Sequence, residues 1–206
     1  MTSRPGAPAV VPAGRLAAGD QPVLPLAGEP ELPVPPPAGE LELRPWRLDD
    51  ADADALLAAG RDPDISHWNL FSVAGRAEAC ERIERMHQRR AAETGAVWAV
   101  APLGGAAVGL AGLNDVDLAG GSAEVVYWVL PAARGGGIAV RAARRLGRWA
   151  LDELGLRRVT LRHSTANPAS CRVAEKAGYA FVATQRGALE HADGRHDVHV
   201  HALAAG

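Results

Sequence analysis

Cysteine and aromatic residues are scarce in this chain. Cys80 and Cys171 are its two cysteines, and Phe, Trp and Tyr together make up 4% of the 206 residues. Two cysteines cannot build a disulfide framework, so we expect a reducing, cytoplasmic location. No apolar stretch approaches the roughly 20 residues of a membrane span. Prolines and charges interrupt every candidate signal peptide near the start, so we expect no membrane partner.

Excess charge is also lacking. The net charge is −2, from 22 basic and 24 acidic residues, which excludes a globally basic nucleic-acid binder. Arg141, Arg144, Arg145 and Arg148 recur at helical spacing, opposite an alanine and leucine stripe. We interpret this arginine stripe as a solvated helix face and expect no nucleic-acid partner.

Proline is concentrated at one end of the chain. Ten of the 15 prolines fall at or before Pro37, in a stretch without aromatic residues or an apolar period. Such a segment cannot bury enough surface to offset its ordering entropy. We therefore predict a disordered proline-rich tail over residues 1–39 and one folded domain over residues 40–206.

Hydrophobic periodicity predicts the elements of that domain. The expected helices are residues 49–60, 75–92, 134–154 and 168–177, and the stretch 61–74 is expected to be a loop. The expected strands are 41–45, 97–101, 106–113, 124–130, 159–161, 179–183 and 197–203. A long helix between two buried strands predicts a parallel pair, so the class is α+β or mixed α/β.

A glycine-rich turn separates the strand ending at Leu130 from the longest helix. Its sequence from Arg134 is Arg-Gly-Gly-Gly-Ile-Ala, ending at Ala139. Glycines allow an anion to approach backbone N–H groups, and the helix start adds unpaired donors, so the turn suits a pyrophosphate. A dinucleotide fingerprint is excluded because Val140 stands where a third small residue is needed, and a P-loop because no lysine is near.

Two motifs together carry a family resemblance. Arg134-x-x-Gly137-x-Ala139 follows a strand, and the stretch from Asn167 to Tyr179 comes after a further helix and strand. This pair closely resembles the GCN5-related N-acetyltransferases, most of all the branch with the ribosomal-protein N-terminal acetyltransferases. The resemblance implies a mostly antiparallel mixed sheet of about seven strands, with a splayed central parallel pair and about four flanking helices.

The same resemblance implies an activity and its binding residues. An acetyl group would pass from acetyl-CoA to a primary amine by direct attack in a ternary complex, without a metal. The pantetheine would lie where the central parallel strands splay apart, and Asn167 would contact it or a bound water. A backbone N–H near Val129 would hold the oxyanion. The pyrophosphate would rest on the backbone N–H groups of Arg134, Gly135, Gly136, Gly137, Ile138 and Ala139.

The resemblance also offers two catalytic candidates. Glu124, at the start of the central strand, is the candidate general base, because acids serve as base at this place in some relatives. It is equally well explained as an ordinary carboxylate at a strand end. Ser170 stands where a hydroxyl can face the sulfur and donate to the leaving thiolate, although many family members use a tyrosine there.

The acceptor is left open by the sequence. In relatives the region of His67, Trp68 and Phe71 covers the acceptor, so these residues are candidates for substrate binding or for a hydrophobic plug at a helix end. Asp62 and Asp64 suit a cationic acceptor, but an Asp-Pro-Asp turn needs no ligand. A protein N-terminus, an aminoglycoside-like drug, an amino acid and a polyamine all remain possible acceptors, and a homodimer is possible.

Three histidines near the end of the chain could suggest a metal site. His199 and His201 share one strand face and His196 the other. With no partnering cysteine or acid cluster in sequence, we predict no metal site and interpret Cys171 as a small core residue.

The alternative functions are a catalytically inactive CoA-binding domain and a protein-interaction module using the tail. Retention of both motifs argues against the first, and deletion of residues 1–39 would test the second.

Overall fold

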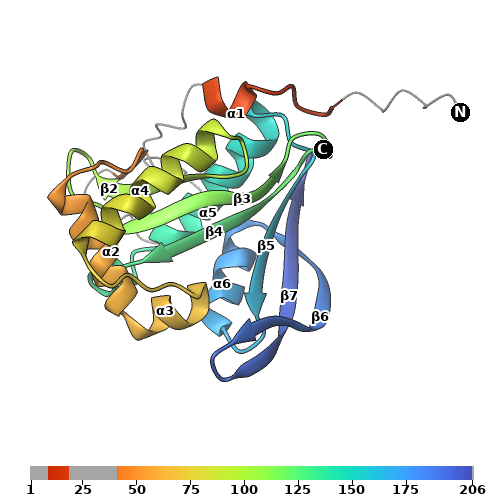
Figure 1. Ribbon diagram of the computed structural model, residues 1–206. Coiled ribbons are helices and arrows are strands. Elements are labelled where there is room, and N and C mark those ends of the chain that lie inside the picture. The colour runs from red at the N-terminus through yellow and green to blue at the C-terminus, as the bar shows by residue number, and fades with distance from the viewer. Residues whose placement is uncertain (1–8, 19–40, 206) are drawn as a thin grey trace, which may run out of the picture.

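The computed structural model describes residues 9–18 and 41–205 (Figure 1). Its helices are α1 (Arg15–Ala18), α2 (Asp50–Arg61), α3 (Pro63–Asn69), α4 (Arg76–Ala91), α5 (Ile138–Arg148) and α6 (Pro168–Ala177). The 3-10 turn η1 (Pro131–Ala133) precedes α5, and the π-helical η2 (Trp149–Glu153) follows it. The strands are β1 (Leu41–Arg44), β2 (Ala96–Pro102), β3 (Gly109–Asp117), β4 (Ser122–Val129), β5 (Arg158–Ser164), β6 (Ala180–His191) and β7 (Gly194–Ala204).

The seven strands form one sheet in the order β1-β2-β3-β4-β5-β7-β6. All neighbours are antiparallel except β4 and β5, which are parallel and joined by the crossover through α5. Only Ser122, Ala123 and Glu124 pair with β5, whereas the pairing of β4 with β3 continues to Val129. The predicted mixed sheet with a splayed central parallel pair is confirmed.

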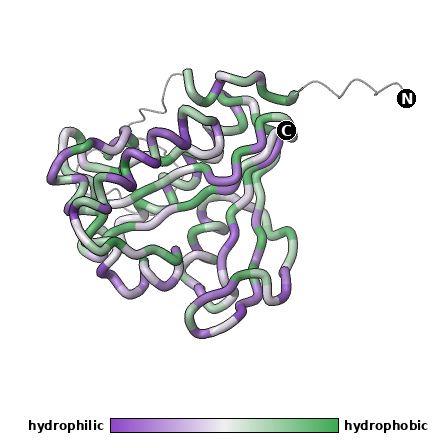
Figure 2. The backbone as a smooth tube through the Cα atoms, in the orientation of Figure 1, coloured by the Kyte–Doolittle hydropathy of each residue, from purple (hydrophilic) through white to green (hydrophobic). Residues whose placement is uncertain are grey.

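Helices cover both faces of the sheet, and each layer has its own apolar core. Alternation along β2 sends Trp98 and Val100 into the core beneath α5, and Ala99 into the core beneath α2 and α4. The tube in Figure 2 shows the corresponding concentration of hydrophobic residues in the central strands. The sheet is therefore covered on both faces, and its two central strands separate at one end.

The prediction of a disordered tail is wrong for residues 9–18. Val11 and Leu16 are buried in the core on the α5 side, with 1% and 2% of their surfaces exposed. Glu93 accepts hydrogen bonds from backbone N–H groups of this segment, including that of Leu16 at 2.7 Å. Two buried apolar side chains, together with the distant Glu93 carboxylate, are therefore enough to order this segment, although its sequence has no sustained hydrophobic periodicity. The rest of the predicted tail lies outside the described residues.

Three elements differ from the predicted ones. The expected loop at 61–74 contains α3, which begins because Asp62 accepts a hydrogen bond from the Ile65 N–H and Pro63 occupies the first helical turn. The helix expected from 134 begins only at Ile138, so the glycine turn precedes it. The last hairpin is longer than expected, because its exposed outer half has no apolar alternation to reveal it.

Among the described residues, no helix is both long enough and apolar enough to cross a membrane.

Candidate active site

A cavity of about 950 Å³ opens where β4 and β5 separate. Its walls come from α3, α4, β4, the glycine turn, α5, β5 and α6, so elements on both sides of the sheet contribute. Most of the residues singled out from the sequence line it: Glu124, Val129, Arg134, Gly135, Gly137, Ile138, Ala139, Asn167, Ser170, Trp68 and Phe71. Gly136 and His67 do not.

The glycine turn presents a helix start to one end of the cavity. Gly137 caps α5 with a left-handed backbone (φ 72°), which a residue with a side chain adopts only under strain. The first backbone N–H groups of a helix have no partner within it, and here they belong to Ile138, Ala139 and Val140, all of which line the cavity. Together with the helix dipole they form a site for a phosphate-type anion.

The splay exposes one edge of β4 to the cavity. The Leu130 N–H donates to the Val108 carbonyl on the β3 side, at 2.9 Å. Backbone N–H groups alternate in direction along a strand, so the Val129 N–H points away from β3, toward the gap that β5 leaves. The Val129 carbonyl, which points the same way, accepts a hydrogen bond from Arg134 Nε at 3.1 Å. An N–H so placed can stabilise a developing oxyanion.

A hydroxyl pair lies beside this edge. The Tyr127 hydroxyl and Ser170 Oγ are 2.6 Å apart. Burial raises the pKa of Tyr127 to about 12, although the hydrogen bond with Ser170 opposes the shift, so the phenol is protonated at neutral pH. Asn167 caps α6, its side chain accepting from the Ser170 N–H at 3.0 Å, and thereby holds Ser170 in position. Tyr127 was missed by the sequence reasoning, which treated β4 only as an apolar run.

The opposite end of the cavity holds Glu124. Burial raises the pKa of this carboxyl above its ordinary value, while the nearby Arg162 guanidinium works against the shift. Arg162 Nη1 lies 3.4 Å from Glu124 Oε2. A carboxylate with a raised pKa is a better proton acceptor than an exposed one, which suits a general base. Arg162 was not identified from the sequence; Glu124 pairs with Thr160 of β5, and Arg162 lies two residues further along that strand on the same face.

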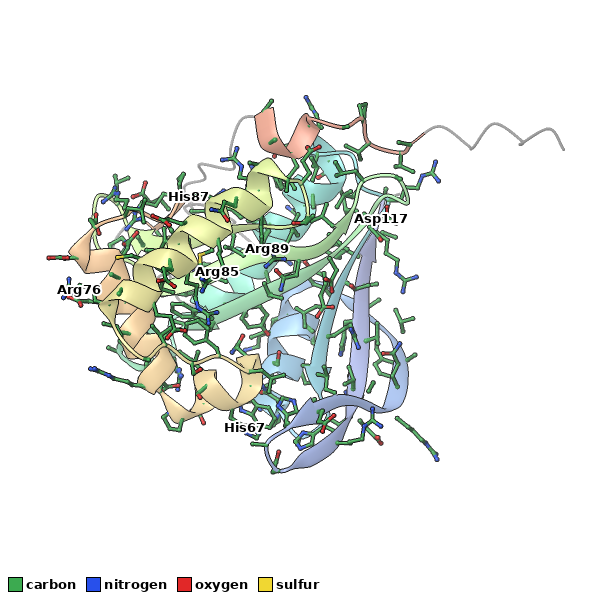
Figure 3. All side chains as sticks on the ribbon, viewed as in Figure 1. His67, Arg76, Arg85, His87, Arg89 and Asp117 are labelled. Atoms are coloured by element: carbon green, nitrogen blue, oxygen red, sulfur yellow. The ribbon has the colours of Figure 1, made fainter. Side chains whose placement is uncertain are left out.

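Arginines also contribute to one wall of the cavity. Arg82, Arg85 and Arg89 of α4 line it, and Figure 3 shows Arg85 and Arg89 projecting from the same side of that helix. Arg82 also stacks over Phe71, with its guanidinium carbon 4.5 Å from the ring centroid. The α4 wall of the cavity therefore carries positive charge.

The acidic residues that could have favoured a cationic acceptor both pair with one arginine. Arg134 reaches Asp62 at 2.6 Å and Asp64 at 3.0 Å, which ties the glycine turn to the start of α3. Asp62 and Asp64 are thus positioning groups for the turn. The Arg134 guanidinium balances one of the two negative charges, and Asp64 also lines the cavity.

The three residues predicted to bind the acceptor, which lie in α3 and in the segment after it, have different surroundings in the structure. Trp68 and Phe71 line the cavity. His67 lies behind it, near the β6–β7 hairpin (Figure 3), where its Nε2 is 3.8 Å from Asp193 Oδ1. His191, which the sequence reasoning did not select, lines the cavity and donates from Nδ1 to the His67 carbonyl.

Comparison with known families decides the class of this site. The family described as an acetyltransferase (GNAT) domain matches residues 40–180. The chain belongs to the GNAT acetyltransferase family. Members of this family are acyl-CoA-dependent N-acetyltransferases that take the acetyl group from acetyl-CoA.

Individual relatives agree with the family assignment. Bacillus subtilis (strain 168) YdaF, whose name describes a ribosomal N-acetyltransferase, is 33% identical over 75 residues, 36% of this chain and 41% of YdaF. The match therefore spans less than half of that relative. Two solved structures share the GNAT fold. Mycobacterium smegmatis RimJ with CoA-disulfide has a TM-score of 0.73 and 22% identity, covering 84% of this chain and 85% of RimJ.

The second solved structure is RimL, the ribosomal L7/L12 alpha-N-protein acetyltransferase, in complex with coenzyme A. It has a TM-score of 0.72 and 17% identity, over 84% of this chain and 98% of RimL. At these identities the two structures support the fold, and the family match supports the activity class.

Proposed function

We propose that this chain acetylates the α-amine of a protein or peptide N-terminus, by direct attack of that amine on acetyl-CoA in a ternary complex. The observation that carries the proposal is the single cavity that joins an anion-binding turn at one end to a buried carboxylate at the other. The name of RimL, an alpha-N-protein acetyltransferase, and that of YdaF, a ribosomal N-acetyltransferase, favour a protein N-terminus as the acceptor class. A cytoplasmic location fits a reaction that consumes acetyl-CoA.

The pKa of the acceptor supports this choice. A lysine-type amine with a pKa of about 10.4 costs roughly 4–5 kcal/mol to deprotonate at pH 7. A terminal α-amine with a pKa of about 7.7–8.0 costs only about 1 kcal/mol. A site with one carboxyl as candidate base is therefore better matched to an α-amine.

The proposed reaction uses residues from both ends of the cavity. Five residues of strand span about 16 Å, so Glu124 would receive the amine proton through a chain of water molecules. The free amine attacks the thioester carbonyl, and the Val129 N–H holds the oxyanion that forms. As the tetrahedral intermediate collapses, the carbon–sulfur bond breaks, the nitrogen loses its extra proton to water, and the thiolate accepts a hydrogen bond from the Tyr127–Ser170 pair and takes up a proton from water, which gives the amide and the free thiol of CoA.

The positive charge on the α4 wall of the cavity points to the kind of N-terminus. Arg82, Arg85 and Arg89 would attract a peptide with acidic residues near its amine and repel polyamines and aminoglycosides. The proposed acceptor is therefore an acidic N-terminal peptide.

Thiol release from acetyl-CoA tests the proposal across amine classes. We expect turnover with a peptide whose free N-terminus is followed by glutamates, and less with the same peptide carrying lysines. The peptide with a blocked N-terminus and an internal lysine, a polyamine and an aminoglycoside serve as the other classes. Turnover confined to the last three would refute an N-terminal acceptor.

A pair of arginine variants tests the charge argument. Arg85→Ser should raise the KM for the acidic peptide about tenfold and leave the KM for acetyl-CoA unchanged. Arg61→Ser removes an arginine that does not line the cavity and should alter neither constant. Equal effects of the two substitutions would remove the arginines of α4 from acceptor recognition.

A further inference from the structure

A cluster of four nitrogen and sulfur donors lies on the wall between α6 and the sheet. Its members are His163 of β5, His199 and His201 of β7, and Cys171 of α6. One donor atom from each lies within 4.8 Å of the others. The sequence argument against a metal relied on the lack of a partnering cysteine, and that premise is wrong, because the fold brings Cys171 to the histidines.

Strand register assembles three of the donors. His163 is paired directly with His199 across β5 and β7, and His201 is two residues along, on the same face. Cys171 is half-buried on α6, which lies along β5 and β7 in Figure 1. It is thus not the enclosed core residue that the sequence suggested. The cluster joins a helix to two strands of the sheet.

The hydrogen bonds of two rings show how their lone pairs are directed. His163 Nδ1 lies 2.9 Å from the Ser164 carbonyl, and His201 Nδ1 lies 3.3 Å from the Tyr179 carbonyl. A carbonyl oxygen can only accept, so each Nδ1 carries the ring hydrogen and each Nε2 of the neutral ring carries a lone pair. Histidine ligands of metals are commonly oriented by such a bond from the other ring nitrogen to a carbonyl.

The two Nε2 atoms then face each other at 3.3 Å, inside a buried site where lone pairs repel. A cation between them removes this repulsion. In a tetrahedral zinc site, with zinc–nitrogen distances of about 2.0–2.1 Å, two nitrogen ligands lie about 3.3 Å apart. The separation of the two Nε2 atoms is the one that such an ion requires.

We propose that His163, Cys171, His199 and His201 form a tetrahedral site for Zn²⁺ or a similar borderline-soft divalent metal. Binding forms one metal–sulfur and three metal–nitrogen bonds and releases the Cys171 thiol proton to solvent. Four protein donors fill the coordination shell, so the site has no open position for substrate and takes no part in acyl transfer. It fastens α6 to β5 and β7, directly after Ser170.

Cobalt(II) is the probe for this site, because it reports both geometry and ligand type. The full chain, stripped with a chelator, should take up one Co²⁺ with the intense visible bands of tetrahedral coordination and a thiolate-to-cobalt band in the near ultraviolet. Added Zn²⁺ should displace the cobalt. Cys171→Ser should lose the near-ultraviolet band, whereas Cys80→Ser, which removes the other free cysteine, should keep it.

His199 is partly exposed, so its substitution gives a second test that does not disturb the core. His199→Gln should weaken Co²⁺ binding by on the order of 100-fold, because loss of even an outer-shell partner costs about 10–100-fold. Zn²⁺ should raise the Tm of the parent chain and of Cys80→Ser, but not of Cys171→Ser. Absence of stoichiometric cobalt uptake, or a spectrum unchanged by Cys171→Ser, would refute the site.

Discussion

Glu124 and Arg162 illustrate how a single side chain acquires its chemistry from its surroundings. Burial destabilises the charged carboxylate and raises the pKa of Glu124. Arg162 Nη1, 3.4 Å from Glu124 Oε2, stabilises the charged form and makes this rise smaller. The residue type and its place at a strand start were legible in the sequence. The approach of Arg162 could not be predicted, because it depends on the register of β5, in which Thr160 pairs with Glu124 and Arg162 lies two residues further along.

A substitution at Glu124 tests its role as base. Glu124→Gln should lower kcat by about 10²-fold near pH 6, since general bases contribute about 10²–10⁴-fold. The deficit should shrink toward high pH, where the acceptor amine loses its proton without help. In the parent enzyme, activity should fall as pH drops through the raised pKa of Glu124. The pH dependence of kcat is the measurement, and parallel profiles for parent and variant would remove Glu124 from the mechanism.

Asp52 offers a prediction about stability. It is fully buried, and both its oxygens receive hydrogen bonds from Arg44, at 2.6 and 2.7 Å. Burial alone would raise the pKa of Asp52, but the hydrogen bonds and charge of Arg44 outweigh it and lower the pKa. Asp52→Asn removes the main charged partner of the buried Arg44 guanidinium and leaves only Glu42, 3.8 Å from Arg44 Nε, so we expect the free energy of unfolding to fall by about 3–5 kcal/mol.

Urea denaturation measures this loss. Asp50→Asn changes an exposed carboxylate of the same helix and should cost less than about 1 kcal/mol. Because the pKa of Asp52 is lowered on folding, its contribution is present at neutral pH and disappears as pH falls through the lowered folded value. Equal effects of the two substitutions would show that the buried pair adds nothing to stability.

At the scale of elements, the glycine turn and α6 show what sequence can predict. The bounds of α6, Pro168–Ala177, were predicted exactly as found, because Asn167 and Gly178 mark its two ends with local capping chemistry. The start of α5 was placed four residues early, because an arginine and three glycines do not by themselves show where helical hydrogen bonding begins. α3 was missed because Asp-Pro-Asp fits both a turn and a capped helix start.

The turn before α5 is the element on which donor binding depends. Gly137→Trp should place an indole at the mouth of the anion site and abolish measurable acetyl-CoA binding. Gly104→Trp is the matched control: Gly104 also has a left-handed backbone (φ 71°), in the turn between β2 and β3, with open space around it. Calorimetric titration with acetyl-CoA gives the answer. Parent-like affinity in the Gly137 variant would remove the pyrophosphate assignment.

At the scale of the whole molecule, the N-terminal segment closes the core on the α5 side. It pairs with the end of β3, where the Val11 N–H donates to the Leu118 carbonyl at 2.9 Å. Arg15 Nη2 reaches the Glu153 carbonyl in η2 at 3.1 Å. Such contacts join positions more than 100 residues apart, and this is the physical reason why local composition could not reveal them.

Deletion of residues 1–18 tests whether this closure stabilises the fold. Burial of the Val11 and Leu16 side chains is worth about 3–6 kcal/mol, and the entropy of ordering the segment offsets part of that. We expect the free energy of unfolding to fall by about 1–3 kcal/mol, while kcat well below the Tm stays unchanged, because no residue of the segment lines the cavity.

Deletion of residues 1–8 is the control and should leave the Tm as in the full chain. If both deletions left the Tm unchanged, the segment would be an appendage and not part of the core. If the longer deletion abolished turnover with the Tm intact, the segment would act in the reaction itself.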